Sequence, residues 1–192
     1  MKLLYIIVFY YGKKELDMDK FIKEWLPYAF IIIFVVLIRT YIITPVIVRG
    51  DSMNNTLKDG EVLFLSKINY EISSIKRFDI VVVKDLDSDL IIKRIIGLPG
   101  DKVEYEDGVL YVNDKIINEE YIDYISEDFN VNSICKITNL ECNGIIPKDM
   151  YLVLGDNREV SADSRVKGLI KRDQILGKTI FRIWPLNKVS II

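Results

Sequence analysis

The residue types that could carry chemistry gather in three short segments of this 192-residue chain. In the first, residues 48–57, Ser52 follows Gly50, whose missing side chain would let backbone amides approach a developing oxyanion. A serine in such a loop is by itself more often a simple turn residue. Because it directly follows the most apolar stretch of the chain, Ser52 becomes a candidate nucleophile at a membrane surface.

The second segment, residues 90–101, places Lys93 and Arg94 inside an otherwise apolar β pattern. Alternate residues of a strand share a face, so these two cations point to opposite sides and at least one of them lies near apolar packing. Arginine keeps its proton almost anywhere, whereas burial can lower the pKa of a lysine until it serves as a base. The alternative is that both stems lie along apolar surface with their heads in water.

The third segment, residues 154–165, is dense in charged and hydroxyl side chains. Asp163 and Arg165 are spaced so that they could pair and brace a loop. The alternative is an ordinary polar surface turn. No single segment decides between a catalytic and a structural interpretation.

The composition removes several classes of site. The chain has no histidine, which excludes a Ser-His-Asp triad, a Cys-His dyad and any histidine-ligated metal site. A base for nucleophilic catalysis must therefore be another residue, and lysine is the obvious candidate. The net charge of −2 gives no sign of nucleic-acid binding. Neither a cofactor nor a metal is expected.

Two cysteines, Cys135 and Cys142, are too few for an all-cysteine zinc site. Their spacing permits a small disulfide loop in an oxidising compartment, or two unpaired thiols in a surface excursion. Both alternatives stay open at this stage.

A long apolar segment begins at Trp25 and predicts a membrane-spanning helix over 25–46, which Pro45 would end. This prediction requires Arg39 to reach towards one interface. A buried core helix is the alternative. More lysines precede the segment than cations follow it closely, which favours a cytoplasmic segment over 1–24 and an extracytoplasmic domain over 47–192. Residues 1–17 are further hypothesised to come from an upstream start codon, with the natural start at Met18.

The rest of the chain has a β pattern. Val, Ile, Tyr and Phe dominate the expected strands, and Asp107-Gly108 is a tight-turn signal. We therefore expect a mainly β, mostly antiparallel domain, a sandwich or a partly open barrel. A more polar stretch, 113–148, reads as an insertion that carries the cysteines. The expected strands are 62–65, 79–84, 90–98, 102–105, 109–112, 151–154 and 179–184.

Taken in order, the three segments resemble the sequence boxes of bacterial type I signal peptidases. Gly50-Asp51-Ser52-Met53 is similar to the nucleophile box of that family, and the run from Ile92 to Asp101 is similar to its lysine box. Gly155-Asp156-Asn157-Arg158 with Ser161-Ala162-Asp163-Ser164-Arg165 resembles its last box. The resemblance extends from about Met18 to the end of the chain and includes the apolar segment.

The resemblance implies a Ser–Lys serine protease that cleaves signal peptides from exported preproteins. Ser52 would be the nucleophile, Lys93 the general base, and Ser161 would orient the lysine amine. The resemblance further implies a bacterial cell-membrane protein in contact with the lipid bilayer. We also expect a single span, a monomer and no contact with nucleic acid. A structural ion pair would join Asp163 and Arg165, and substrate would contact Gly50, Met53, Ile91 and Ile92.

Two positions depart from the family pattern. Asn55 stands where many members have proline, and Gly50 stands where some members carry a serine that assists the oxyanion. Two other interpretations are weaker. A self-cleaving repressor-type protease would need an Ala-Gly cleavage site, and the chain has none. An inactive membrane-tethered scaffold of the same fold would not be expected to keep Ser52, Lys93 and Ser161.

Overall fold

The computed structural model describes residues 18–67, 75–85, 89–122 and 127–192, and side chains from residue 22 onwards. The chain divides into two compact units, Met1–Tyr41 and Ile42–Ile192. Residues 1–17, for which an upstream start codon was hypothesised, lie outside the described residues. So does most of the predicted cytoplasmic segment 1–24.

The first unit contains helix α2, Met18–Tyr41. From Leu26 to Leu37 nearly all of its large apolar side chains are solvent-exposed, on every side of the helix. Within the described part of the chain, no helix combines the length and the apolar character needed to traverse a bilayer.

The predicted spanning helix over 25–46 is wrong at its C-terminal end. The helix stops at Tyr41, and strand β1, Ile43–Ile47, follows and pairs along its whole length with β2, Val62–Ser66. Pro45 has no amide hydrogen for a helix, and its β-branched neighbours favour a strand. Because β1 is at the edge of its sheet, the missing donor of Pro45 is tolerated there.

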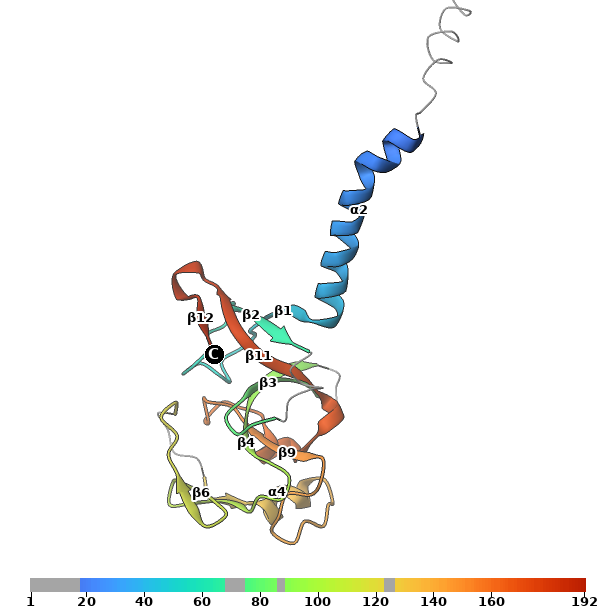
Figure 1. The fold of residues 1–192 in the computed structure, drawn as a ribbon. Helices are drawn as coiled ribbons and strands as arrows, with labels where there is room; N and C mark the ends of the chain where they lie inside the picture. The colour runs from blue at the N-terminus through green and yellow to red at the C-terminus, as the bar shows by residue number, and fades with distance from the viewer. Residues whose placement is uncertain (1–17, 68–74, 86–88, 123–126) are drawn as a thin grey trace, which may run out of the picture. The chain divides into compact units, whose positions relative to one another are not determined.

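The second unit is built around an eight-stranded antiparallel sheet in the described chain (Figure 1). Its order is β1-β2-β11-β3-β4-β9-β10, with β12 beside β11. The remaining bounds are β3 Ile80–Lys84, β4 Leu90–Gly97, β9 Met150–Leu154, β10 Ile170–Lys171, β11 Ile175–Trp184 and β12 Ser190–Ile191. Three short helices, α5 Ser164–Lys167, η1 Arg172–Gln174 and η2 Leu186–Lys188, connect its later strands.

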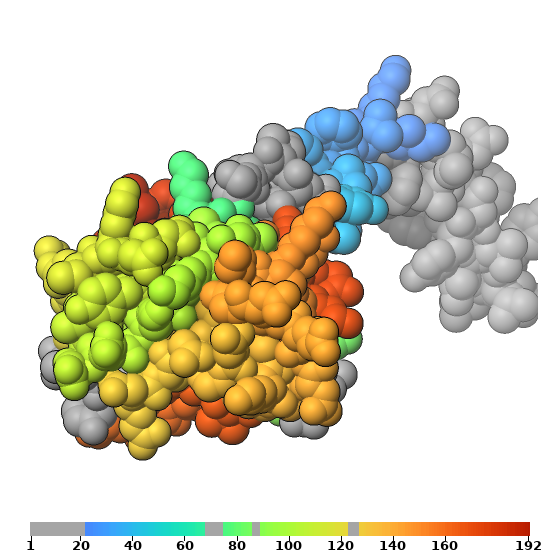
Figure 2. Space-filling view, turned by 90° about the horizontal axis from the view of Figure 1, so that it is seen from below, coloured from blue at the N-terminus to red at the C-terminus, as the bar shows by residue number. Residues whose placement is uncertain are grey.

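A second sheet has the order β7-β6-β5-β8, with β5 Val103–Glu106, β6 Val109–Val112, β7 Lys115–Ile117 and β8 Phe129–Asn130. Asp107 and Gly108 both have positive φ, as the predicted tight hairpin requires. Helix α4, Val131–Ile137, follows β8 and is capped by the side chain of Asn130. Figure 2 shows this sheet, in yellow-green, beside the chain that continues through α4 on one face of the molecule.

Three apolar clusters form the core. One lies on each face of β3, because Ile80 and Val82 belong to one cluster and Val81 and Val83 to the other. A third cluster joins the second sheet and α4 to the end of β4 and to β9. The described part of the predicted insertion 113–148 therefore shares its core with the large sheet.

The prediction of a mainly antiparallel β fold is confirmed. Each of the seven expected strand segments lies on a strand of the structure. Strands β1, β7, β8, β10 and β12 were not predicted. Most of them are only two or three residues long, which is too short for a readable alternation.

Candidate active site

Ser52 lies in a loop between β1 and β2, which we call the nucleophile loop, residues 48–61. Its ends are joined by the Val48 N–Glu61 O hydrogen bond of 2.8 Å. Met53 and Leu57 fix the loop to the core, because their side chains are almost fully buried. Gly50 has a φ of 77° and donates its amide to Asp59 at 2.8 Å. The loop thus holds the half-buried Ser52 directly before the anchored Met53.

Lys93 lies in the middle of β4, where it pairs with Val81 of β3. Its side chain is only 3% exposed. Burial lowers the pKa of its amine from 10.5 to about 8; the charges of Asp163 and Asp156 raise it in part, and that of Arg165 lowers it. The Lys93 amine therefore loses its proton around pH 8, well below the pH at which an ordinary lysine does.

Gly155 is the point at which the three segments meet. The register of β4 on β9 pairs Arg94 with Leu154, so one further step places Lys93 opposite Gly155. A Cβ on Gly155 would lie 2.2 Å from Ser161 Oγ and 2.5 Å from the Ser52 carbonyl oxygen. The same Ser52 carbonyl accepts a hydrogen bond from Asn157 N at 3.0 Å. Ser52 and Ser161 therefore border this glycine directly, and Lys93 is next to the residue that pairs with Leu154.

The predicted ion pair of Asp163 and Arg165 is present at 2.9 Å. Asp163 also accepts from Gly155 N at 3.0 Å and caps α5, so it fixes the backbone around Gly155. Ser161 is buried, and its Oγ has no hydrogen-bond partner among the described residues. The hydrogen bond that was expected between Ser161 and the Lys93 amine is therefore not formed in this structure.

Arg94 and Asp156 form a buried bidentate pair that the sequence reasoning did not assign. Arg94 Nε and Nη2 donate to the two carboxylate oxygens at 2.8 and 2.6 Å. The Thr56 hydroxyl also donates to Asp156, which ties the nucleophile loop to the chain after β9. The sequence did contain a signal, because a cation in an apolar strand needs a buried partner. Only the fold shows that this partner is Asp156.

The expected substrate-contacting residues lie in two places. Met53 and Ile92 belong to one buried cluster, beneath the nucleophile loop. Ile91 packs against the cluster on the other face of the sheet, and Gly50 is exposed. Ile92 therefore lies on the face of the sheet next to the nucleophile loop, to which Gly50 and Met53 belong. Ile91 lies on the opposite face.

Comparisons with known proteins agree with the motifs. Residues 22–184 match the family model described as signal peptidase, peptidase S26. The chain is 44% identical over 183 residues to signal peptidase IB of Staphylococcus aureus, covering 89% of this chain and 94% of that protein. It is 35% identical over 177 residues to signal peptidase I of Bacillus caldolyticus, covering 88% and 93%.

A crystal structure of a signal peptidase I from Enterococcus faecalis is 34% identical, with a TM-score of 0.47, and covers 55% of this chain and 97% of that one. The family match extends over most of the chain, and both sequence relatives match along nearly their whole length. The chain therefore belongs to the signal peptidases of peptidase family S26, which makes it a serine endopeptidase that cleaves signal peptides.

Proposed function

We propose that Ser52 and Lys93 form the catalytic dyad of this signal peptidase. The observation that carries the proposal is the buried Lys93, whose pKa is lowered to about 8 in a chain that has no histidine. Ser52 belongs to the loop that is hydrogen-bonded to the chain around Gly155, and Lys93 lies opposite that glycine by strand register. The arrangement supports an acyl-enzyme mechanism.

In the first step, Ser52 Oγ attacks the carbonyl carbon of the scissile peptide bond while its proton passes to Lys93 Nζ. The tetrahedral intermediate then collapses as the carbon–nitrogen bond breaks, and Lys93 gives the proton to the leaving amine. A water molecule next attacks the Ser52 ester as Lys93 takes its proton. The bond between the acyl carbon and Ser52 Oγ then breaks, and Lys93 returns the proton to Oγ. The products are the signal peptide with a free carboxylate and the mature protein with a free amine.

The residues after β9 take supporting roles in this proposal. Ser161 Oγ, buried and without a partner among the described residues, is available to accept or donate a hydrogen bond to Lys93 during turnover. Asp163 and Arg165 hold the backbone on which Gly155 and Ser161 lie. Gly50, Met53, Ile91 and Ile92 are proposed to border the extended substrate.

We propose further that the chain is a monomer anchored at the bacterial cell membrane through the apolar surface of α2, with the second unit outside the cytoplasm. The exposed apolar side chains of α2 favour burial in lipid. The disulfide between Cys135 and Cys142 favours an oxidising compartment for the second unit. Extraction of cell membranes with alkaline carbonate tests the anchor, and release of the protein would contradict it.

The dyad is tested by incubating a preprotein in detergent with the wild type, Ser52→Ala, Lys93→Ala and Lys93→Arg. Only the wild type should release the signal peptide, because alanine provides no nucleophile or base and arginine keeps its proton. Circular dichroism establishes that each variant is folded. Cleavage by folded Lys93→Arg would overturn the role of Lys93. A folded wild type without activity would instead favour the inactive scaffold.

A further inference from the structure

Residues 118–122, which we call the brace segment, follow β7 in the second sheet and reach the chemistry-bearing part of the large sheet. Two of its residues, Glu119 and Tyr121, make contacts with groups next to the candidate active site. The side chain of Glu119 is only 4% exposed, although the segment belongs to a polar stretch of the sequence. Its neighbour Glu120 is exposed.

Glu119 holds Arg158, a guanidinium with no exposed side-chain surface. The Arg158 Nη2–Glu119 Oε1 distance is 2.5 Å. Arg158 Nε donates in turn to the Gly155 carbonyl at 3.0 Å. Removing the charge of Glu119 would leave the buried Arg158 without its counter-ion. Arg158, which donates to the Gly155 carbonyl, would then no longer be held in place.

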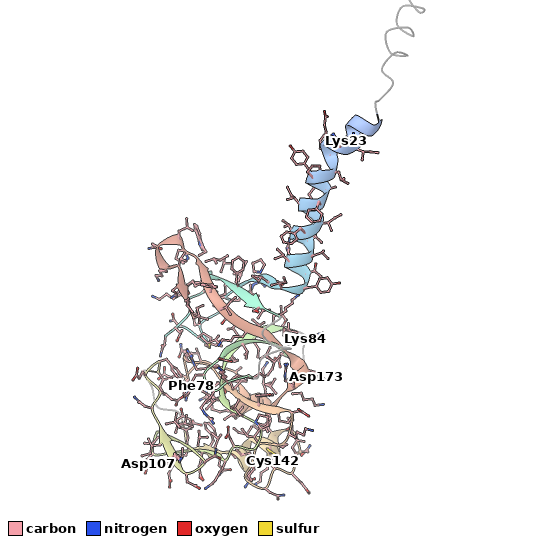
Figure 3. The ribbon with its side chains drawn as sticks, viewed as in Figure 1. Lys23, Phe78, Lys84, Asp107, Cys142 and Asp173 are labelled. Carbon is pink, nitrogen blue, oxygen red and sulfur yellow. A yellow bond between two sulfur atoms is a disulfide. The ribbon has the colours of Figure 1, made fainter. Side chains whose placement is uncertain are left out.

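Tyr121 completes a second connection. Its ring lies against the Arg94 guanidinium, 3.9 Å from the centroid, and packs edge-on against Phe78 at 5.7 Å. Figure 3 labels Phe78 in the middle of the second unit. The Tyr121 carbonyl accepts from Asn55 Nδ2 of the nucleophile loop at 3.3 Å, and its hydroxyl donates to Glu119 at 2.5 Å. One residue therefore contacts both the nucleophile loop and the buried pair beneath it.

We propose that Glu119 and Tyr121 are positioning residues for signal-peptide cleavage, which hold Gly155, Arg94 and the nucleophile loop in one fixed arrangement. The inference rests on the dyad proposed above. Gly155 borders the Ser52 carbonyl and Ser161 Oγ, so a displacement of its backbone shifts both groups. A misplacement of about 1 Å can lower a rate by on the order of 100-fold.

The test compares Glu119→Gln with the matched control Glu120→Gln in the full-length protein, on a preprotein in detergent. We expect kcat of Glu119→Gln to fall about 10-fold or more, with KM within about 2-fold, because transition-state geometry is lost and substrate binding is kept. Glu120→Gln should match the wild type. Glu119→Asp, which keeps the charge, should recover part of kcat.

A merely structural role would lower the melting temperature and leave kcat of the folded enzyme unchanged. Wild-type kcat for Glu119→Gln would therefore overturn the proposal. If that variant does not fold, Tyr121→Phe decides, because it keeps the ring on Arg94 and removes only the hydroxyl. Its kcat should fall about 3-fold or more, and a wild-type kcat would overturn the proposal.

Ser52→Ala is included in the same assay to separate the two proposals. Cleavage by Ser52→Ala, or no cleavage by the folded wild type, would refute the dyad and the positioning role with it. An active wild type, an inactive Ser52→Ala and a fully active Glu119→Gln would refute the positioning role alone.

Discussion

The Lys93 amine is buried where its charge is disfavoured. The proposed mechanism requires this amine, but its charged form lowers the stability of the folded protein. The folded protein releases this proton near pH 8, whereas the unfolded chain keeps it until about 10.5. Between these values the unfolded state binds more protons, so the free energy of unfolding rises with pH. The shift corresponds to on the order of 3 kcal/mol.

We therefore expect Lys93→Met to be inactive yet more stable than the wild type at pH 7, with the difference disappearing as pH approaches 10.5. Urea unfolding in detergent at pH 7 and pH 10 measures it. The control is Lys84→Met on the adjacent strand β3, where the lysine is exposed and the change should be small. A loss of stability in Lys93→Met at pH 7 would contradict the interpretation.

The unpartnered hydroxyl of Ser161 gives a second prediction. Most buried hydroxyls are hydrogen-bonded, so removal usually leaves a partner unsatisfied and lowers stability. Ser161→Ala should instead leave the melting temperature within about 2 °C, because no group in the described chain is hydrogen-bonded to Oγ, while kcat falls about 10-fold or more. Unchanged kcat would remove Ser161 from the mechanism.

At this scale the sequence predicts residue types better than their partners. Lys93 was identified because a chain without histidine needs another base, and Asp163 with Arg165 because they are close in the chain. The pairing of Arg94 with Asp156 joins residues 62 positions apart. Glu119 and Tyr121 lie in a stretch that looked like a polar excursion, and only the contact between the two sheets gives them a role.

Among the elements, the turn after β9 has the least room for change. Gly155→Ala would place a methyl group within 2.5 Å of both the Ser161 hydroxyl and the Ser52 carbonyl oxygen. Because the Ser52 position is backbone, the strain cannot be relieved by a rotamer change alone. We expect kcat to fall about 100-fold with native circular dichroism. A Gly155→Ala enzyme with wild-type kcat would mean that the turn does not position the dyad.

The disulfide belongs to the third apolar cluster, which includes the second sheet and α4, and not to the site. Cys135 is in α4 and Cys142 lies after it, with a Cα–Cα distance of 6.2 Å. Replacing both by serine should lower the free energy of unfolding by about 2–4 kcal/mol and leave kcat within about 2-fold. Denaturant unfolding and preprotein cleavage measure the two effects. A large loss of kcat in the folded variant would instead link this loop to catalysis.

Elements were predictable where a pattern repeats over several residues. The seven expected strands alternate or carry continuous β-branched runs, and all of them are strands. The end of α2 was not predictable from hydropathy, because Ile43–Ile47 is as apolar as the helix before it. What makes it a strand is its pairing with β2, a contact with residues about 20 positions later.

For the whole molecule, the division between Tyr41 and Ile42 separates the apolar helix α2 from the unit that contains the candidate site. The second unit contains the three apolar clusters and every residue of the candidate site. Helix α2 contributes exposed apolar surface and no residue to those clusters. A chain that begins at Ile42 should therefore fold on its own and keep the chemistry, while it loses the proposed membrane anchor.

We expect this truncated chain to cleave a soluble signal-peptide substrate with kcat within about 3-fold of the full-length enzyme. Its processing of a preprotein embedded in lipid vesicles should fall about 10-fold or more, because the anchor no longer raises the local concentration of enzyme at the bilayer. Replacing the apolar residues of α2 by a different apolar sequence is the matched control and should restore processing. Equal rates on embedded preprotein with and without α2 would show that the helix does not deliver the site to its substrate.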